Sequence, residues 1–404
     1  MPDAAMKASK RLSTLLPYGD DGWDLYRKAL ARQNAGLPVT MLTIGEHDIG
    51  TAPAILDAMD AAARKGLTGY APVPGQDALR ACVAKRIERQ TGAATSAENV
   101  LIVPGGQAGL FASHIATLDP GDIALFIDPY YATYPGTIRG AGGLPRVIVT
   151  GPETRFLPSR DALAEAAPGA RTLLINTPNN PTGQIYDRAT LEGIAETCMT
   201  HDLWLICDEV YDTQVWSGTH LSPRALPGMA ERTLVVGSMS KSHAMTGSRI
   251  GWVVGPAEII AHMADLATHT TYGVPGFVQA AALWALEQGP GLEEDVSAPF
   301  RRRRALAEIA LAGNNRIRAL PSDATMYLLL DIRPTGMSGT AFAEALLDAE
   351  GIAVMPGESF GRAAAGHVRV AMTIDDDAFA EALARLARFA ETCPSGARSG
   401  FEMV

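Results

Sequence analysis

The chain has 404 residues, of which 47% are hydrophobic, and it carries a formal net charge of −10 at pH 7. This length and composition allow a large core divided between two domains, and the acidic balance disfavours binding to nucleic acid or to an anionic membrane. Its four cysteines show no CxxC spacing, and it has neither an apolar leader nor an apolar run of about 18 residues, so we expect a soluble, cytoplasmic protein without a zinc site or a membrane span.

The first two-thirds of the chain alternates short apolar runs with longer amphipathic ones. A short strand at 39–45 (VTMLTIG) comes first. Further strands are predicted at 99–103, 122–127, 172–176, 203–209, 233–238 and 249–255, with helices such as 107–118 and 187–202 between them. This alternation favours an α/β fold class, with a mostly parallel sheet covered by helices on both faces.

The pattern changes after about residue 290. A long helix carries an arginine run at 301–304, which we expect to be a solvated helical face. It is followed by predicted strands at 325–332, 352–357 and 367–372 and helices at 338–349 and 375–392. These elements predict a smaller α+β domain that the strand at 39–45 joins. The predicted division is 1–49 (N-terminal arm and part of the small domain), 50–289 (large domain) and 290–404 (small domain), with a loosely ordered tail at 394–404.

Chemistry is expected just past the strands, because ligands of open α/β sheets bind at the carboxyl ends. After the strand at 99–103, Gly105, Gly106 and Gln107 open a helix, which suits an anion, although a plain tight turn would look the same. After 172–176, Asn180 could donate a hydrogen bond into the cleft, and the Asn180–Pro181 bond is a candidate for the cis form.

Two further polar side chains follow the apolar run at 203–207, within and just past the predicted strand. Asp208 comes directly after this apolar run, so its carboxylate is expected at the mouth of the sheet, where it needs a cationic partner or several donors. A helix cap or a structural ion pair is the alternative reading. Tyr211 lies three residues on and could face the same site.

Lys241 stands out because the chain uses arginine for most of its basic residues. The lysines are Lys7, Lys10, Lys28, Lys65, Lys85 and Lys241. An amine can form an imine with a carbonyl compound, whereas the pKa of arginine is too high for this. Two other residues of the same stretch, SMSKSHAMTGSR, suit a phosphate. They are Ser238, through its hydroxyl, and Arg249, through two N–H groups of its guanidinium. The alternative, a surface lysine, fits the arginine preference poorly.

These groups together would hold a single molecule. It needs a phosphate for the glycines, Ser238 and Arg249, and an aldehyde for Lys241. It also needs a protonated ring nitrogen for Asp208 and a ring hydroxyl for Asn180 and Tyr211. Pyridoxal 5′-phosphate (PLP) has all four.

The motifs resemble those of the fold-type-I PLP enzymes, specifically the class I/II aminotransferases, over residues 38–392. The family's NPTG stands at 180–183, its DEVY at 208–211 and its SxSKxxxxxGxR at 238–249, which includes Ser240. The resemblance implies a large PLP-binding domain with a small domain, Lys241 as the Schiff-base lysine, Asp208 as partner of the ring nitrogen, and Asn180 and Tyr211 as ligands of the ring hydroxyl.

Weaker matches extend the resemblance. They imply that Tyr131 stacks on the cofactor, that Arg369 clamps the substrate carboxylate and that Gly45 lies at the substrate mouth. Tyr70 would reach the phosphate of a neighbouring subunit, which implies a homodimer with shared active sites. The chain departs from the family at His47, where a proline is usual, and at Ala324 or Thr325, where a glycine is usual.

Within the family, segments such as CMTHDLWLICDEVY and SKSHAMTG are most similar to those of bacterial arginine–pyruvate transaminases. Transfer of an amino group from arginine to pyruvate is therefore expected, with Glu46 and Asp48 available for a guanidinium unless they are ordinary solvated loop acids. The core motifs leave open a β-lyase, a decarboxylase or a cyclase on the same scaffold. A non-catalytic PLP-binding regulator is disfavoured, because the catalytic-type region begins by about residue 40 and leaves no room for a DNA-binding domain.

Overall fold

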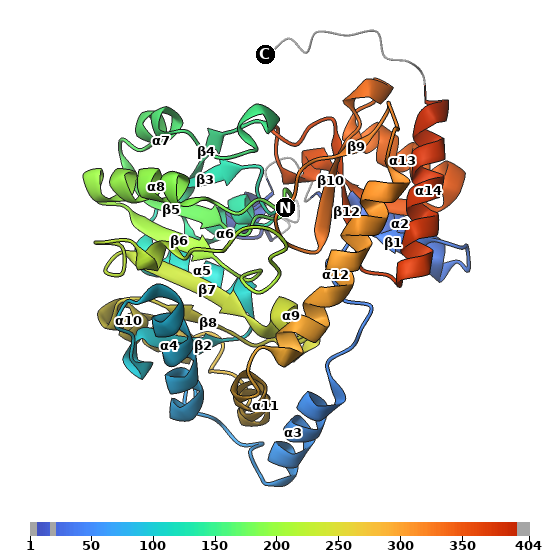
Figure 1. The fold of residues 1–404 in the computed structure, drawn as a ribbon. Coiled ribbons are helices and arrows are strands. Elements are labelled where there is room, and N and C mark those ends of the chain that lie inside the picture. The colour runs from blue at the N-terminus through green and yellow to red at the C-terminus, as the bar shows by residue number, and fades with distance from the viewer. Residues whose placement is uncertain (1–5, 17–21, 394–404) are drawn as a thin grey trace, which may run out of the picture.

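The computed structural model describes residues 6–16 and 22–393, so the predicted tail at 394–404 lies outside it. A seven-stranded sheet forms the larger part of the molecule (Figure 1). In sheet order its strands are β2 (Val100–Val103), β8 (Gly251–Val254), β7 (Thr233–Ser238), β6 (Trp204–Asp208), β5 (Ala170–Asn176), β3 (Ile123–Asp128) and β4 (Leu144–Val149). The pairs from β7 to β4 are all parallel, and β8 is antiparallel to both of its neighbours, so the predicted mostly parallel sheet is confirmed.

Helices cover both faces of this sheet, because successive side chains of each buried strand point to opposite faces and both sets are apolar. One face packs against α5 (Gly106–Thr117), α6 (Tyr134–Ala141) and α10 (Ala257–Thr268). The other face packs against α4 (Asp77–Thr91), α7 (Arg160–Ala166), α8 (Arg188–Thr200) and α11 (Gly276–Glu287), and α3 (Pro53–Arg64) packs against α11. In β5, Leu173 and Ile175 belong to the second core and Leu174 to the first.

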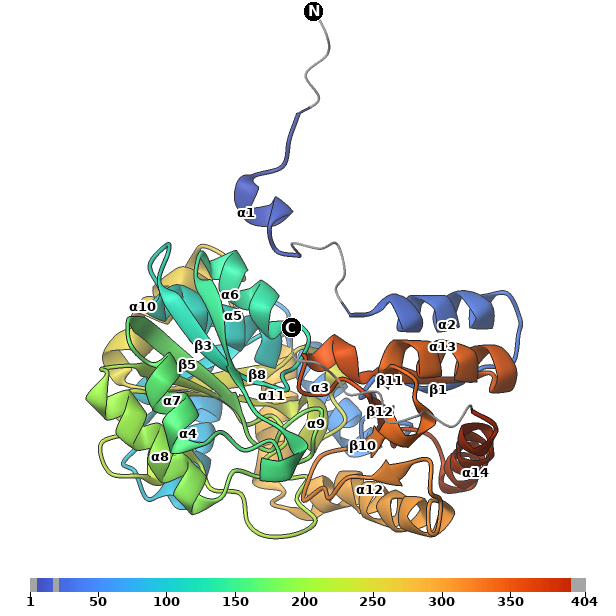
Figure 2. The ribbon, with the colours of Figure 1, turned by 90° about the horizontal axis from the view of Figure 1, so that it is seen from above.

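A second sheet of five strands has its own core (Figure 2). Its order is β1 (Thr40–Leu42), β11 (Ile352–Pro356), β12 (His367–Ala371), β10 (Tyr327–Asp331) and β9 (Arg318–Ala319). Thr40 pairs with Ile352 in a parallel ladder, so the N-terminal strand lies in the C-terminal sheet as expected. The predicted domain limits after residues 49 and 289 stay predictions.

Two pairs of helices flank the small sheet. Helix α2 (Asp24–Asn34) packs against α13 (Gly339–Glu350), and α12 (Gly291–Ala310) packs against α14 (Asp376–Thr392). The strands lie between the two pairs (Figure 2). No helix in the described residues is long and apolar enough to cross a membrane.

The prediction that residues 301–304 form a solvated face is wrong for one residue. Arg301 and Arg302 are exposed, but Arg303 is only 3% exposed. Its guanidinium pairs with Asp48 at 2.6 Å and with Asp376 at 2.8 Å. Two carboxylates from distant parts of the chain therefore allow this arginine to be buried.

Candidate active site

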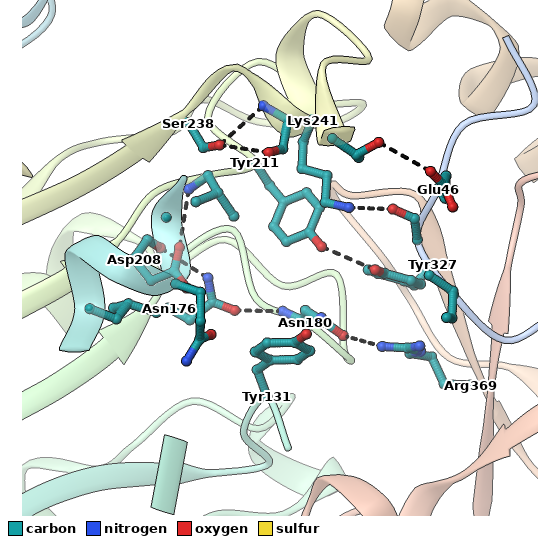
Figure 3. A pocket seen from close by; sticks show the side chains of 18 of the residues that line it. Glu46, Tyr131, Asn176, Asn180, Asp208, Tyr211, Ser238, Lys241, Tyr327 and Arg369 are labelled. Carbon is teal, nitrogen blue, oxygen red and sulfur yellow. Dashed lines mark hydrogen bonds between the residues drawn. The ribbon is translucent and has the colours of Figure 1, made fainter. Parts of the chain in front are cut away.

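A cavity of about 290 Å³ lies between the carboxyl ends of the large-sheet strands and the small sheet (Figure 3). Asn176, Asp208 and Ser238 reach it from the carboxyl ends of β5, β6 and β7. The small-sheet side contributes Tyr327 from β10 and Arg369 from β12. The cavity thus occupies the strand ends that the sequence pointed to, and both parts of the molecule complete it.

Lys241 projects into this cavity from α9 (Met239–Ser242), a one-turn helix that directly follows β7. The Ser238 hydroxyl caps that helix by accepting the Ser240 N–H at 3.0 Å. The Lys241 Nζ donates a hydrogen bond to the Gly45 carbonyl. Burial lowers the pKa of the Lys241 amine, which raises the fraction of neutral amine available for reaction.

Asp208 is the last residue of β6 and is 5% exposed. The Tyr134 hydroxyl donates to its Oδ2 at 2.6 Å, and the Val210 N–H donates to its Oδ1 at 3.3 Å. Burial raises the pKa of Asp208 to about 6, and the Tyr134 hydrogen bond opposes that rise. No lysine or arginine of the described chain forms an ion pair with this carboxylate, so it does not belong to a structural ion pair within that part of the chain.

Arg369 is a second buried charge, 1% exposed, on the opposite wall. Its guanidinium lies 4.1 Å from the Tyr327 ring centre and 4.4 Å from the Phe360 ring centre. It donates to Asn180 Oδ1 at 2.9 Å and to the Thr43 carbonyl, while its Nε has no partner. In the described residues it has no carboxylate partner, so its charge is available for a ligand.

A third feature is the corner formed by Gly105, Gly106 and Arg249. Gly105 has φ +85°, and a Cβ there would lie 2.3 Å from Arg249 Nη2, so only glycine allows this close approach. Gly106 begins α5 and turns free N–H groups toward the cavity end of the sheet. Arg249 is exposed and donates to the carbonyls of Thr246 and Pro104. An arginine beside a helix N-terminus favours an anion site over a plain turn.

The structure brings most of the predicted site residues together. Those that line the cavity are Gly45, Gly106, Gln107, Tyr131, Asn180, Asp208, Tyr211, Ser238, Ser240, Lys241, Arg249 and Arg369. Gly105 lies beneath Arg249 rather than on the cavity wall. Tyr70 is not at this cavity: it is 91% exposed and packs against Tyr272, with 5.1 Å between ring centres.

Sequence reasoning missed several residues at the same cavity. Trp23, Ile44, Leu110, Asn176, Val210, Thr246 and Tyr327 also line it. The Tyr327 hydroxyl lies 3.1 Å from the Tyr211 hydroxyl. Tyr134, which was also missed, donates a hydrogen bond to the Asp208 carboxylate. Asn176 offered one signal, a polar residue at the end of a buried strand. Its side chain donates to the Asp208 carbonyl at 2.9 Å and accepts the Asn180 N–H at 2.7 Å.

The entrance loop separates the two acids that the sequence grouped. Glu46 lines the cavity and accepts a hydrogen bond from the Thr246 hydroxyl at 3.2 Å. Asp48 does not line it, because both of its carboxylate oxygens are held by Arg303, at 2.8 and 2.6 Å. The expectation that Asp48 is available for a guanidinium is therefore wrong.

The other unusual positions also have a defined geometry. The Asn180–Pro181 bond is cis, as suggested. Of the two residues considered for the missing glycine, Thr325 has φ +73°, a left-handed conformation that is rare for a β-branched side chain. His47 lies against the Phe300 ring, and its Nε2 is 3.4 Å from the side-chain nitrogen of Gln214.

Comparison with known proteins gives a consistent result. The family described as "Aminotransferase class I and II" matches residues 38–386. An arginine–pyruvate transaminase, AruH, of Pseudomonas aeruginosa is 41% identical over 370 residues, covering 91% of this chain and 94% of that protein. An aspartate/prephenate aminotransferase of Thermus thermophilus is 37% identical, covering 89% and 93%.

Solved structures give the same result. An aspartate aminotransferase from Thermus thermophilus, solved with maleate, superposes with a TM-score of 0.89 at 34% identity. The match covers 95% of this chain and 100% of that chain. The two-sheet architecture is therefore that of the aspartate aminotransferases.

Proposed function

Because this chain belongs to the class I and II aminotransferase family, we propose that it binds PLP at Lys241 and uses it to transfer an amino group from an L-amino acid to a 2-oxo acid. The observation that carries the proposal is the pair of uncompensated charges around the Lys241 amine. Asp208 has no cationic partner and Arg369 has no carboxylate partner within the described residues, and both line the Lys241 cavity. A cationic ring nitrogen and a substrate carboxylate would satisfy the two.

The residues present fit this cofactor. Arg249 and the N-terminus of α5 at Gly106 would hold the phosphate, together with the hydroxyls of Ser238 and Ser240. Asp208 would hold the ring nitrogen in its protonated form, and Asn180 and Tyr211 would bind the ring hydroxyl. Tyr131 would stack on the ring. When bound, PLP supplies an aldehyde that condenses with amines and a ring that withdraws electrons from the substrate Cα.

Two residues would then act on the substrate. Arg369 binds the α-carboxylate through its planar fork and fixes the orientation of the Cα–H bond. Burial lowers the pKa of Lys241, which favours its neutral amine. This amine would accept the proton from the substrate Cα and deliver it to the carbon of PLP that carried the aldehyde oxygen. Asp208 would remain ionised beside the protonated ring nitrogen.

For the substrates, we propose arginine as the amino donor and pyruvate as the acceptor. The support is the similarity to the arginine–pyruvate transaminase, together with Glu46 at the cavity wall. Glu46 is exposed and its known partner is a hydroxyl, so its charge is free to pair with a guanidinium. A β-lyase, decarboxylase or cyclase is not favoured, because the similar proteins are named aminotransferases.

The cofactor proposal is tested by reduction with borohydride. Purified protein should be yellow, and reduction should fix the cofactor to the peptide containing Lys241. The other lysines of the chain, such as Lys85, serve as internal controls. An adduct on one of those lysines instead of Lys241 would contradict the proposal.

The substrate proposal is tested with matched donors. Arginine, citrulline, aspartate and alanine are compared with pyruvate as acceptor; citrulline has nearly the shape of arginine without its charge. Glu46→Gln should raise KM for arginine about five-fold, the worth of an exposed ion pair, and leave citrulline and alanine unchanged. If aspartate exceeded arginine ten-fold in kcat/KM, the arginine proposal would fail while the aminotransferase proposal stood.

We also propose a cytoplasmic homodimer in which Tyr70 of each subunit serves its neighbour's site. Tyr70 is almost fully exposed and remote from the cavity of its own subunit, which is what a residue with that role requires. The four cysteines are free, which fits a reducing compartment.

A further inference from the structure

The helix that carries Lys241 is one turn long, so its ends must be held by other parts of the protein. Ser238 satisfies the N-terminal end. At the other end, the N–H groups of His243 and Met245 donate to the Met239 carbonyl, and no backbone N–H of the described chain donates to the Lys241 carbonyl. That carbonyl needs a partner, because an unpaired buried acceptor is destabilising.

Gln214 supplies the partner from a different segment. Its side-chain nitrogen donates to the Lys241 carbonyl at 2.9 Å, and the residue is 0% exposed. Its own backbone is fixed at both ends, by the Tyr211 carbonyl at 2.9 Å and by the Thr325 N–H at 2.8 Å. The backbone of Lys241 is thereby tied to the loop that carries Tyr211 and to the entry into β10.

His47 contacts the same side-chain nitrogen of Gln214 and so helps to hold the amide. A carbonyl only accepts, so the amide nitrogen rather than the oxygen must face Lys241. The second N–H of the same nitrogen then faces His47 Nε2 at 3.4 Å. Because an amide nitrogen cannot accept, Nε2 is the acceptor in this contact, and Nδ1 has no partner in the described residues. Burial lowers the pKa of His47 to about 3, and the nearby Lys241 charge lowers it as well, so the ring is neutral at neutral pH. The Phe300 ring, 5.4 Å away, holds the imidazole in place.

We propose that His47 and Gln214 are positioning residues for Lys241, with His47 fixing the amide that in turn fixes the lysine backbone. The inference rests on the proposed role of Lys241 as the residue that binds the cofactor. The contact from Nζ to Gly45 is lost when the amine binds an aldehyde, whereas a contact to the backbone carbonyl persists.

The test compares two ligands that differ only at the group Lys241 attacks. PLP forms an imine with Lys241, with loss of water, whereas pyridoxine 5′-phosphate has an alcohol in place of the aldehyde. Equilibrium binding of both is measured on cofactor-free wild type, His47→Phe and Gln214→Leu. His47→Phe keeps an aromatic ring against Phe300 and removes the acceptor. Both variants should lose about three- to ten-fold in PLP affinity, the worth of one hydrogen bond, with unchanged affinity for the alcohol.

Two further variants make the result specific. His47→Gln places a carbonyl oxygen near the position of Nε2 and should restore PLP affinity to within about two-fold of wild type. His114→Phe is the matched control, because His114 is a fully buried histidine and neither of its ring nitrogens has a partner. It should leave the ratio of the two affinities unchanged.

The outcomes separate this inference from the proposed function. If His47→Phe and Gln214→Leu lost affinity equally for both ligands, their role would be generally structural and the inference would be overturned. It would also be overturned if these variants lost affinity for neither ligand. If wild type binds PLP without an adduct at Lys241, the proposed function fails first. Should His47→Phe fail to fold, Gln214→Leu and His47→Gln still decide the question.

Discussion

Asp208 is a buried carboxylate without a cationic partner in the described residues. It is buried, it accepts two hydrogen bonds, and its pKa is raised by burial from 3.8 to about 6. Between these two pH values the folded protein binds a proton that the unfolded chain does not, so this group makes stability fall as pH rises from about 4 to about 6. At neutral pH the ionised carboxylate destabilises the cofactor-free protein.

Replacing Asp208 by Asn should therefore stabilise the cofactor-free protein at pH 7 relative to pH 4. The free-energy difference between variant and wild type should shift in favour of Asn by on the order of 3 kcal/mol across that range, since two pKa units are involved. Buried histidines such as His114 also titrate in this range, but they are common to both proteins and cancel. Urea unfolding at the two pH values measures the shift.

The same Asp208→Asn variant should lose most of its transaminase activity, because an amide cannot keep the ring nitrogen protonated. Turnover within a few-fold of wild type would show that Asp208 has a structural role only. The two measurements are independent: the first concerns the protein alone, and the second concerns the proposed cofactor.

How far the site could be predicted depended on the residue. Lys241 could be singled out because lysine is scarce in this chain, and Asp208 because a charged residue ends an apolar strand. Tyr134 could not, because its partner lies 74 positions away and its own segment shows the ordinary pattern of a buried helix. Tyr327 and Tyr211, 116 positions apart, meet only because the loop after β6 packs against the core of the small sheet.

At the scale of the elements, regular strands and helices were predicted closely and exceptions were missed. β7 begins and ends where its apolar run does. The strand β4 was not predicted, because it is a partly exposed edge strand with a proline and no clear alternation. The burial of Arg303 was missed because its two acids, Asp48 and Asp376, lie 255 and 73 positions away.

The arginine run on α12 offers a matched pair of variants. Arg303→Met should cost about 3 kcal/mol of unfolding free energy, because it leaves Asp48 and Asp376 without their buried partner. Arg302→Met removes a neighbouring charge that also contacts Asp376 but is 59% exposed, and it should cost less than about 1 kcal/mol. Chemical denaturation measures both. Equal costs for the two variants would show that burial of Arg303 contributes little.

At the scale of the whole molecule, the proposed shared active site can be tested by mixing two inactive variants. Lys241→Ala and Tyr70→Ala are each expected to be inactive or nearly so. If Tyr70 acts in the neighbouring site, a hybrid dimer has one site with both defects and one site with neither. Random pairing in an equal mixture makes half of the dimers hybrids, so about a quarter of wild-type activity should return.

Action of Tyr70 within its own subunit would give no recovery, since each site would keep one defect in every combination. Mixing Lys241→Ala with Asp208→Asn is the control. Both of these residues line the same cavity of one chain. A hybrid of these two variants has no intact site, and activity should stay absent.

The pairing of Thr40 with Ile352 has a consequence for how the protein is made. During synthesis, β1 emerges early but cannot find its neighbour β11 until nearly the whole chain has been translated. The strands of the large sheet lie between them in sequence, so that sheet can assemble first while β1 waits. Gly45, just past β1, and Arg369, on β12, reach the cavity only in this last step. A nascent chain that already holds Asp208 and Lys241 in place would still lack Arg369, the proposed partner of the substrate carboxylate, so under this proposal the capacity to bind substrate is acquired at the very end of folding.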